Sequence, residues 1–266
     1  MTGPPAAEER LVVRDLRIAF GSRRVVDLGS LRLGAGEIVG LAGESGSGKS
    51  MTAMAILGLA THAGATVEGS IRLDGEEIMG APERRLRALR GSRIAAIFQS
   101  PLSAFNPVYR VGATFIGALR LHGATDDEAK DRAEAAMREV LLPPDILRRY
   151  PHQLSGGQAQ RVAIAQALAL RAEVLLADEP TSALDVTVQA EILESLRRVR
   201  DEVGMSILFI SHDLAVLAEL SDHLAVMQRG VVVESGPTAQ VLGDPRDDYT
   251  KELVAAVPKI GVRLAG

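Results

Sequence analysis

The sequence predicts an α/β fold built on a largely parallel sheet. Apolar segments of strand length alternate with helical patterns through most of the 266 residues, and this alternation is typical of parallel sheets. The apolar residues 38–42 also run directly into a glycine-rich loop and then into a helix start, which is the context of a phosphate-binding loop. Both observations point to a sheet that presents ligands at the carboxyl ends of its strands.

The N-terminal part of the chain is predicted to form short strands separated by turn residues. The predicted strands are 11–13, 16–20, 25–26, 31–33 and 38–42. Residues 69–73 form a further strand, which enters a type I′ hairpin turn at Asp74-Gly75.

Residues 100–154 change character, because strand patterns fade and helical ones appear. Thr125 and Glu128 form a capping box, so a helix begins after Thr125 and ends before Pro143-Pro144. The apolar face of this helix is predicted to comprise Ala129, Ala133, Ala136, Met137, Val140 and Leu141. The pattern indicates a helical insertion inside an α/β core.

The α/β pattern surrounds this insertion. The predicted strands are 93–98, 174–177, 206–210, 224–228 and 231–234, the last two joined at Arg229-Gly230. Residues 159–170 form a mostly apolar helix. A further helix carries Val188, Ile192, Leu196, Val199 and Val203 on one face.

Composition excludes several classes of protein. There is no cysteine, which rules out disulfides, cysteine-ligated zinc and iron–sulfur clusters. The net charge of −4 and the lack of a basic run argue against nucleic acid as the main partner. No segment approaches the roughly 18 apolar residues that span a bilayer. Residues 1–10 lack a signal-peptide pattern and are interpreted as a frayed leader.

The glycine-rich loop fits G-x-x-x-x-G-K-[ST] at every fixed position. Its residues are Gly43, Glu44, Ser45, Gly46, Ser47, Gly48, Lys49 and Ser50, with Met51 next in the helix start. Glycines let successive backbone N–H groups face one anion, and the helix start adds its own. Lys49 is expected to reach the β- and γ-phosphates and Ser50 to ligate Mg²⁺. The loop indicates a nucleoside triphosphate without choosing among kinase, GTPase, helicase and pump.

An acidic pair, Asp178-Glu179, closes the buried strand 174–177. At the carboxyl end of a parallel strand, Asp178 is expected to hold Mg²⁺. Glu179 is expected to orient the attacking water, a contribution of about 10²- to 10⁴-fold in rate. A solvated acidic turn before Pro180 is the alternative.

Two further polar residues follow buried strands. Gln99 precedes Ser100-Pro101 and is a candidate Mg²⁺ ligand that senses the γ-phosphate, although a loop amide is the alternative. His212 follows the strand 206–210 at the expected ligand edge, although a lone histidine is more often structural.

A second anion-binding helix start lies at residues 155–158. Its residues are Ser155, Gly156, Gly157 and Gln158. Ser155 is a good N-cap residue, and the two glycines expose backbone N–H groups. An ordinary helix cap is the alternative.

With these motifs in this order, the chain resembles the ATP-binding cassette (ABC) ATPases over roughly residues 11–258. The resemblance implies a P-loop NTPase core of the RecA type with an N-terminal antiparallel β subdomain and an inserted helical subdomain. It divides a single domain into a nucleotide-binding core (11–99 and 155–240), a helical subdomain (100–154) and a C-terminal extension (241–266). It also implies adenine stacking on Phe20 and communication across a dimer by Asp185.

Several motifs narrow the resemblance to the peptide/nickel importer branch. They are Phe98-Gln99-Ser100-Pro101, Ala104-Phe105-Asn106-Pro107, Tyr150-Pro151-His152-Gln153-Leu154, residues 181–189 and the tail from Gly243. One departure is Asp247-Asp248, where the branch usually has His-Pro before Tyr-Thr. Another is the lack of the cysteines that some longer peptide-type members carry. The cargo, peptides or nickel and other metal chelates, stays open at this point.

The resemblance implies an ATPase that uses ATP and Mg²⁺ at the cytoplasmic face of the cell membrane, as a peripheral subunit. Its implied partners are a second ABC ATPase subunit, a paralogue rather than an identical chain, and two transmembrane permease subunits. An extracytoplasmic substrate-binding protein would act through the permease, and no nucleic acid is expected. Phe105 and Tyr109 are candidates for the permease groove, with core packing as the alternative. A non-transport ABC ATPase acting on nucleic acid or ribosomes, and a cassette that binds ATP without hydrolysis, are the competing hypotheses.

Overall fold

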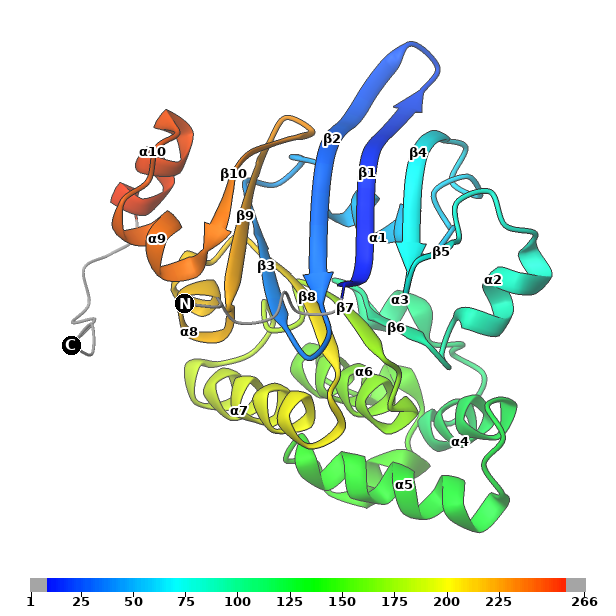
Figure 1. The fold of residues 1–266 in the computed structure, drawn as a ribbon. Coiled ribbons are helices and arrows are strands. Elements are labelled where there is room, and N and C mark those ends of the chain that lie inside the picture. Colours follow the sequence, from blue (N-terminus) through cyan, green and yellow to red (C-terminus); the bar gives the residue numbers. More distant parts are fainter. Residues whose placement is uncertain (1–8, 257–266) are drawn as a thin grey trace, which may run out of the picture.

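The computed structural model describes residues 9–256, and in it two sheets share a core (Figure 1). Most of the predicted leader lies outside the described residues, but Glu9 and Arg10 belong to the first strand rather than to a frayed segment. Residues 257–266 of the predicted C-terminal extension also lie outside the described residues.

The first sheet is antiparallel, with the order β2-β1-β4-β5. Its strands are β1 (Glu9–Phe20), β2 (Arg23–Gly34), β4 (Thr66–Leu73) and β5 (Glu76–Glu77). The predicted strands 11–13 and 16–20 are one strand with a bulge, because Asp15 has a φ of 49° and the pairing with β4 shifts there. The predicted strands 25–26 and 31–33 are likewise both parts of β2. The type I′ turn is supported by φ values of 47° at Asp74 and 78° at Gly75.

The second sheet has the order β10-β9-β3-β8-β7-β6 and confirms the largely parallel prediction. Its strands are β3 (Ile38–Ala42), β6 (Ile94–Ile97), β7 (Val174–Asp178), β8 (Ser206–Ser211), β9 (His223–Gln228) and β10 (Val231–Pro237). Each neighbouring pair is parallel except β9 and β10, which form the predicted hairpin around Arg229-Gly230.

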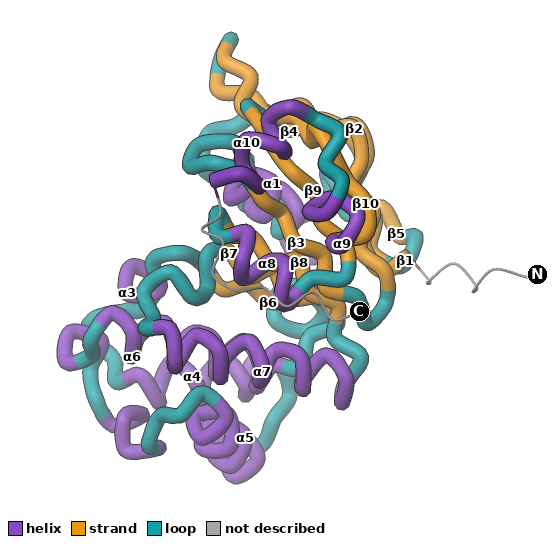
Figure 2. The backbone as a smooth tube through the Cα atoms, turned by 90° about the vertical axis from the view of Figure 1, so that its left-hand side faces the viewer, coloured by secondary structure: helices purple, strands orange, loops and turns teal. Residues whose placement is uncertain are grey.

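Alternate residues of the parallel strands face two separate cores, as the period of two requires. In β8, Leu208 and Ile210 join the core shared with the antiparallel sheet and with helix α1 (Lys49–Ile56). Ile207 and Phe209 join the core on the opposite face, with the helical layer. Figure 2 shows the strands gathered in one part of the molecule and helices α4 to α7 in the other.

The remaining helices are mostly short. They are α2 (Glu83–Leu89), α3 (Pro101–Ala104), α4 (Val111–Leu121), α5 (Asp126–Glu139), α6 (Gly156–Leu170), α7 (Val186–Val203), α8 (Leu214–Leu220), α9 (Thr238–Gly243) and α10 (Asp248–Ala256), with 3-10 turns at Pro144–Arg148 and Pro151–Gln153. None of the helices within residues 9–256 is long and apolar enough to cross a membrane.

The capping box of α5 is confirmed, since the Thr125 hydroxyl accepts the N–H of Glu128 at 3.3 Å. The prediction that Leu141 belongs to the apolar face of this helix was wrong. Leu141 is 47% exposed because α5 ends before it and its φ of 58° turns the chain away. Val203 belongs to α7 as predicted but is 45% exposed, because it is the last residue of the helix.

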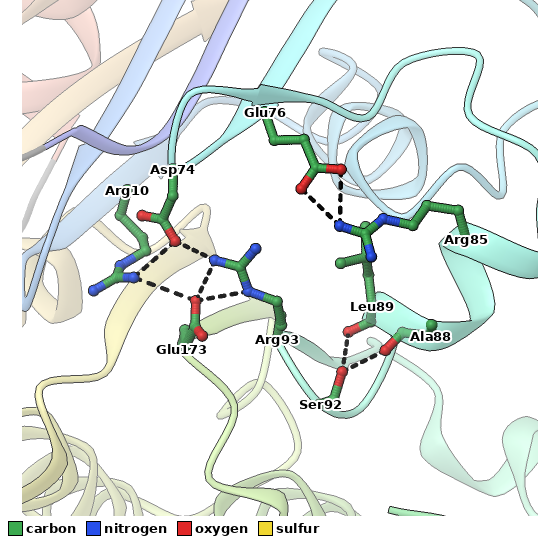
Figure 3. A network of polar contacts seen from close by, with 9 residues as sticks. All are labelled: Arg10, Asp74, Glu76, Arg85, Ala88, Leu89, Ser92, Arg93 and Glu173. Atoms are coloured by element: carbon green, nitrogen blue, oxygen red, sulfur yellow. Dashed lines mark hydrogen bonds and ion pairs between the residues drawn. The ribbon is translucent and has the colours of Figure 1, made fainter.

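An ion-pair network ties the two sheets together at the amino ends of β6 and β7 (Figure 3). Glu173 Oε2 accepts from Arg93 Nη2 at 2.7 Å and from Arg10 Nη1 at 3.2 Å. Both arginines also contact Asp74, in the turn after β4. Hydrogen bonding to Glu173 raises the pKa of Arg93 against the opposing effect of burial. The network therefore joins four segments that lie far apart in the sequence.

Candidate functional site

A pocket of about 610 Å³ lies where the loops after β3, β6, β7 and β8 meet. These strands are neighbours in the parallel sheet, so their carboxyl ends open on one edge. Twelve predicted site residues line the pocket: Gly43, Glu44, Ser45, Gly46, Gly48, Lys49, Ser50, Met51, Gln99, Asp178, Glu179 and His212. Ser47 is buried within the same loop. The sequence motifs, more than a hundred residues apart in the chain, thus converge on one cavity.

The glycine-rich loop depends on glycine at specific points. A Cβ at Gly43 would lie 2.1 Å from the carbonyl oxygen of Met227, so β9 leaves no room for a side chain. Gly48 precedes α1 with a φ of 108°, a backbone conformation that other residues rarely adopt. The loop therefore curls tightly between β3 and α1, and the first residues of α1, Lys49, Ser50 and Met51, line the pocket.

Lys49 lies folded back into the loop. Its Nζ donates to the carbonyl oxygens of Gly43 at 2.6 Å and Glu44 at 2.9 Å. Burial lowers the pKa of Lys49, while the charges of Glu179, Asp178 and Glu44 oppose that shift. The ammonium group is held by carbonyl oxygens at the centre of the site, in a place where an anionic ligand would improve its electrostatic environment.

Asp178 closes β7 and is buried. Burial raises the pKa of its carboxyl group, against a hydrogen bond from the Ser50 hydroxyl that lowers it. Its Oδ1 atom has no hydrogen-bond partner among the described residues. A buried carboxylate oxygen without a partner is costly, and a cation supplies the missing interaction.

The oxygens around Asp178 fit Mg²⁺. Ser50 supplies a hydroxyl group, Asp178 a carboxylate and Gln99 a side-chain amide in the lining of the same pocket. Mg²⁺ prefers such oxygen ligands and usually keeps waters and phosphate oxygens as the others. Within residues 9–256 no group of three histidine, cysteine or acidic side chains could hold a metal alone, so this mixed oxygen set is the candidate.

Glu179 and His212 form a pair at the carboxyl ends of β7 and β8. Glu179 Oε1 lies 2.8 Å from Nδ1 of His212 and accepts the backbone N–H of the same residue at 3.1 Å. Glu179 itself has a φ of 50°, an uncommon conformation that is fixed by its N–H donating to Ile210 O at 2.9 Å. Strained backbone of this kind often occurs at functional sites.

Several predicted site residues lie outside the pocket lining. Phe20 is 38% exposed at the end of β1. Residues 155–158 begin α6, where Ser155 and Gln158 form a reciprocal capping box and Gly156 is exposed. Asp185 caps α7 by accepting the N–H of Val188 at 3.0 Å. The structure therefore does not bring these residues to the cavity of their own chain, and their roles stay predictions.

Sequence reasoning missed four residues near the loop. Val25 and Leu253 line the pocket. Tyr249 accepts the N–H of Glu44 through its hydroxyl oxygen at 3.1 Å, and Gly230 donates its N–H to the Ser47 carbonyl at 2.8 Å. Val25 could have been predicted as a pocket residue because it lies shortly after Phe20 in the sequence. The other three residues come from the C-terminal quarter of the chain, and no local sequence pattern predicts their contacts.

Comparison with known proteins assigns the chain to a family. The family description "ABC transporter" matches residues 27–182, which contain the glycine-rich loop, residues 155–158 and the Asp178-Glu179 pair. This match covers more than half of the chain.

Curated relatives are similar over nearly the whole chain. A peptidoglycan transport ATP-binding protein YejF from Agrobacterium fabrum is 48% identical over 94% of this chain and 47% of its own length. A glutathione import ATP-binding protein GsiA from Salmonella typhimurium is 45% identical over 87% of this chain and 39% of its own length. A putative peptide import ATP-binding protein from Brucella abortus is 44% identical over 92% of this chain and 75% of its own length. The chain thus spans half or less of the length of the first two relatives.

Solved structures agree with this fold. A dimeric bacterial ABC transporter cassette, MJ0796, has a TM-score of 0.76 and 26% identity, over 86% of this chain and 98% of that one. A post-hydrolysis dimer of the same cassette bound to ADP and phosphate gives a TM-score of 0.76 and 27% identity over the same shares.

Proposed function

This chain belongs to the ABC transporter family, and we propose that it is the ATP-hydrolysing subunit of a bacterial importer for peptide-type cargo. The observation that carries the proposal is the convergence of the glycine-rich loop, Gln99, Asp178, Glu179 and His212 on one pocket. ATP is the substrate that these groups suit, because the loop and helix start offer backbone N–H groups and an ammonium group to its phosphates.

The oxygen set formed by Ser50, Asp178 and Gln99 would hold Mg²⁺. When bound with ATP, the ion would neutralise charge on the phosphate oxygens. The chain's own residues prepare for it, since the Oδ1 atom of Asp178 is already buried and has no hydrogen-bond partner within residues 9–256. Lys49 would reach the β- and γ-phosphates from its place on the loop carbonyl oxygens, because its ammonium group has three N–H donors.

Glu179 is the proposed general base. Its carboxylate is mostly buried and is oriented from two directions by His212, through Nδ1 and through the backbone N–H. A carboxylate fixed in this way can accept a proton from water that attacks the γ-phosphate. His212 is 65% exposed at its side chain, so it stands between Glu179 and solvent.

We propose that two cassettes complete each site. Ser155 and Gly156, at the start of α6, are exposed, and residues 155–158 are not among the described residues that line the pocket of their own chain. The backbone N–H groups of a helix start suit an anion. The similarity to a dimeric cassette supports placing it over the nucleotide of a partner subunit. A paralogous partner is proposed because the branch resemblance favours one. Asp185, at the cap of α7, would lie at the same interface.

The permease subunits would contact the helical region 100–154. Phe105 is a poor candidate for that surface because it is 7% exposed and packs in the core. Tyr109 is 58% exposed and remains the candidate for this surface, and Val108 and Leu102 are further exposed apolar residues of the same region. On this proposal the subunit sits at the cytoplasmic face of the membrane, and an extracytoplasmic binding protein delivers cargo to the permease.

Peptides are the favoured cargo over nickel or other metal chelates. The three relatives above carry names that concern peptidoglycan, glutathione and peptides, which all contain peptide bonds. A test is to purify the chain with its native complex, reconstitute that complex in proteoliposomes and measure ATP turnover with its binding protein. Stimulation by short peptides and not by nickel chelates is expected. Isolation with ribosomes or nucleic acid, and no membrane subunit, would contradict the importer assignment.

A further inference from the structure

The C-terminal helix α10 contacts the phosphate-binding loop directly. Tyr249, in the first turn of α10, is 7% exposed, and its hydroxyl oxygen accepts the backbone N–H of Glu44 at 3.1 Å. Leu253, one helical turn further along, lines the nucleotide pocket. Figure 1 shows α10 beside the β9–β10 hairpin, on the side of the molecule away from the helical region. The helix therefore forms part of the wall of the pocket.

The Tyr249 contact fixes one peptide group of the loop from outside. The peptide that joins Gly43 to Glu44 is planar, so its N–H and its carbonyl point in opposite directions. Its N–H is held by Tyr249, and its carbonyl oxygen accepts Lys49 Nζ at 2.6 Å. Rotation of this peptide would break both bonds at once. Tyr249 thus keeps the carbonyl aimed at Lys49 and the ammonium group inside the loop.

Tyr249 is itself held in place by Asp247. The Oδ1 atom of Asp247 accepts the N–H of Tyr249 at 2.9 Å and that of Thr250 at 3.3 Å, which caps the start of α10. The segment before it is anchored to β10, because Glu234 accepts the N–H groups of Arg246 and Asp247. The Asp247 carboxylate therefore supplies the cap on which the position of Tyr249 depends.

We propose that Tyr249 is a positioning residue for phosphate binding, which acts through the Gly43–Glu44 peptide and is held by the Asp247 cap. The inference rests on the proposed function, since ATP phosphates are the ligand that Lys49 would receive. Its physical core, the hydrogen bond from Glu44 to Tyr249, can be tested without nucleotide.

The first test is amide hydrogen exchange of the nucleotide-free full chain. Tyr249→Phe removes the hydroxyl and keeps the ring, so α10 can pack as before. We expect exchange of the Glu44 amide to become about 5- to 10-fold faster, the usual worth of one neutral hydrogen bond. The Lys251→Met variant, which changes an exposed residue of the same helix, should leave Glu44 unaffected. Unchanged Glu44 exchange in Tyr249→Phe overturns the proposal, whatever the chain does with ATP.

The second test is the affinity for a non-hydrolysable ATP analogue with Mg²⁺, measured by calorimetry on the same variants. Tyr249→Phe and Asp247→Ala should raise Kd about 3- to 10-fold. Asp247→Asn keeps a hydrogen-bond acceptor, so its affinity for the analogue should be close to that of the wild type. A Kd for Tyr249→Phe equal to that of the wild type overturns the positioning role. Wild-type chain that binds no analogue, with Glu44 exchange still altered by Tyr249→Phe, would instead contradict the proposed function and leave the Tyr249–Glu44 contact supported.

Discussion

The carboxylate of Glu179 and the imidazole of His212 lie 2.8 Å apart, and the backbone N–H of His212 donates to the same carboxylate oxygen. One residue therefore orients Glu179 through both its main chain and its side chain. The uncommon φ of Glu179 is held by a separate bond to β8. This geometry fixes the direction in which the Glu179 side chain enters the pocket.

Replacement of Glu179 by Gln should separate binding from hydrolysis. The amide keeps the size of the side chain but cannot accept a proton, so we expect kcat for ATP to fall about 10²- to 10³-fold. Nucleotide binding should remain, and the dimer should persist longer with ATP bound. Phosphate release and equilibrium binding measure the two effects. Glu202→Gln, at an exposed position of α7, is the matched control, and equal turnover in both variants would refute the role of Glu179.

His212→Ala tests the orienting partner. The backbone N–H of residue 212 would still donate to Glu179, so the carboxylate should lose one of its two restraints. We expect kcat to fall about 10²-fold and Kd for ATP to change less than threefold. His62→Ala, an exposed histidine outside the pocket lining, should have no effect. A loss of ATP affinity with unchanged kcat would show that His212 binds nucleotide instead.

Asp178→Asn should stabilise the nucleotide-free protein while abolishing Mg²⁺-dependent hydrolysis. Burial raises the pKa of Asp178 above the ordinary value of 3.8. Between 3.8 and the raised value the folded state binds more protons than the unfolded chain, so the free energy of unfolding falls as pH rises through that range. Asn removes this contribution. We expect a gain of roughly 1 kcal/mol at neutral pH, measured by urea unfolding.

The pH dependence supplies the control for that variant. The stability difference between Asp178→Asn and wild type should shrink as pH falls below the raised pKa, because the wild-type carboxyl group is then neutral. Asp201→Asn, which changes an exposed carboxylate, should show no such gain. A destabilised Asp178→Asn protein at neutral pH would mean that the carboxylate has favourable contacts that outweigh its burial.

Gly156→Asp tests whether the start of α6 serves a partner subunit. A Cβ at Gly156 would meet no described atom within 4 Å beyond its chain neighbours and its own helix backbone, and an acidic residue in the first turn of a helix is favourable, so the fold should hold. The new negative charge would repel nucleotide phosphates brought to it by a partner. We expect ATP affinity of the isolated chain to stay within twofold and hydrolysis by the assembled complex to be lost. Gly156→Ala is the uncharged control, and weakened binding in the isolated chain would favour action in cis.

Glu173→Gln should weaken the ion-pair network without touching the nucleotide site. Its side chain is 40% exposed, so the loss should be modest, about 0.5–1 kcal/mol in the free energy of unfolding. High salt should reduce the difference from wild type, because screening weakens the wild-type ion pairs. Chemical denaturation at low and high salt measures both. An altered Kd for ATP would show that the two ends of the sheet are coupled.

Local patterns were sufficient for much of the fold. The strand 38–42 coincides with β3, and the capping box at Thr125 places the start of α5, because both depend on residues close in sequence. The bulge at Asp15 was missed because the apolar runs 11–13 and 16–20 are separate in the sequence, while pairing with both β2 and β4 keeps the strand continuous. Tertiary contacts decided that case.

Local patterns likewise identified one part of the site, and tertiary contacts decided the rest. The residues that follow β3, β6, β7 and β8 were found from motif and strand order, since parallel topology brings their ends together. The sequence allowed Phe105 either in the permease groove or in the hydrophobic core, and only its packing in the structure assigned it to the core. The contact between Tyr249 and Glu44 joins residues 205 positions apart, and no periodicity or turn chemistry encodes such a pairing. The division into residues 11–99, 100–154, 155–240 and 241–266 stays a prediction.

The bonds from Gly230 to Ser47 and from Glu44 to Tyr249 have a consequence for synthesis of the chain. Glu44 leaves the ribosome 205 residues before its partner Tyr249, and Ser47 likewise leaves it long before its partner Gly230. The strand before the phosphate-binding loop, β3, also pairs with β8 and β9, which are synthesised much later. Long-range pairing of this kind forms late. A nascent chain therefore carries the complete motif long before it carries a finished pocket, and full ATP affinity should arise only after the residues up to Tyr249 have been made.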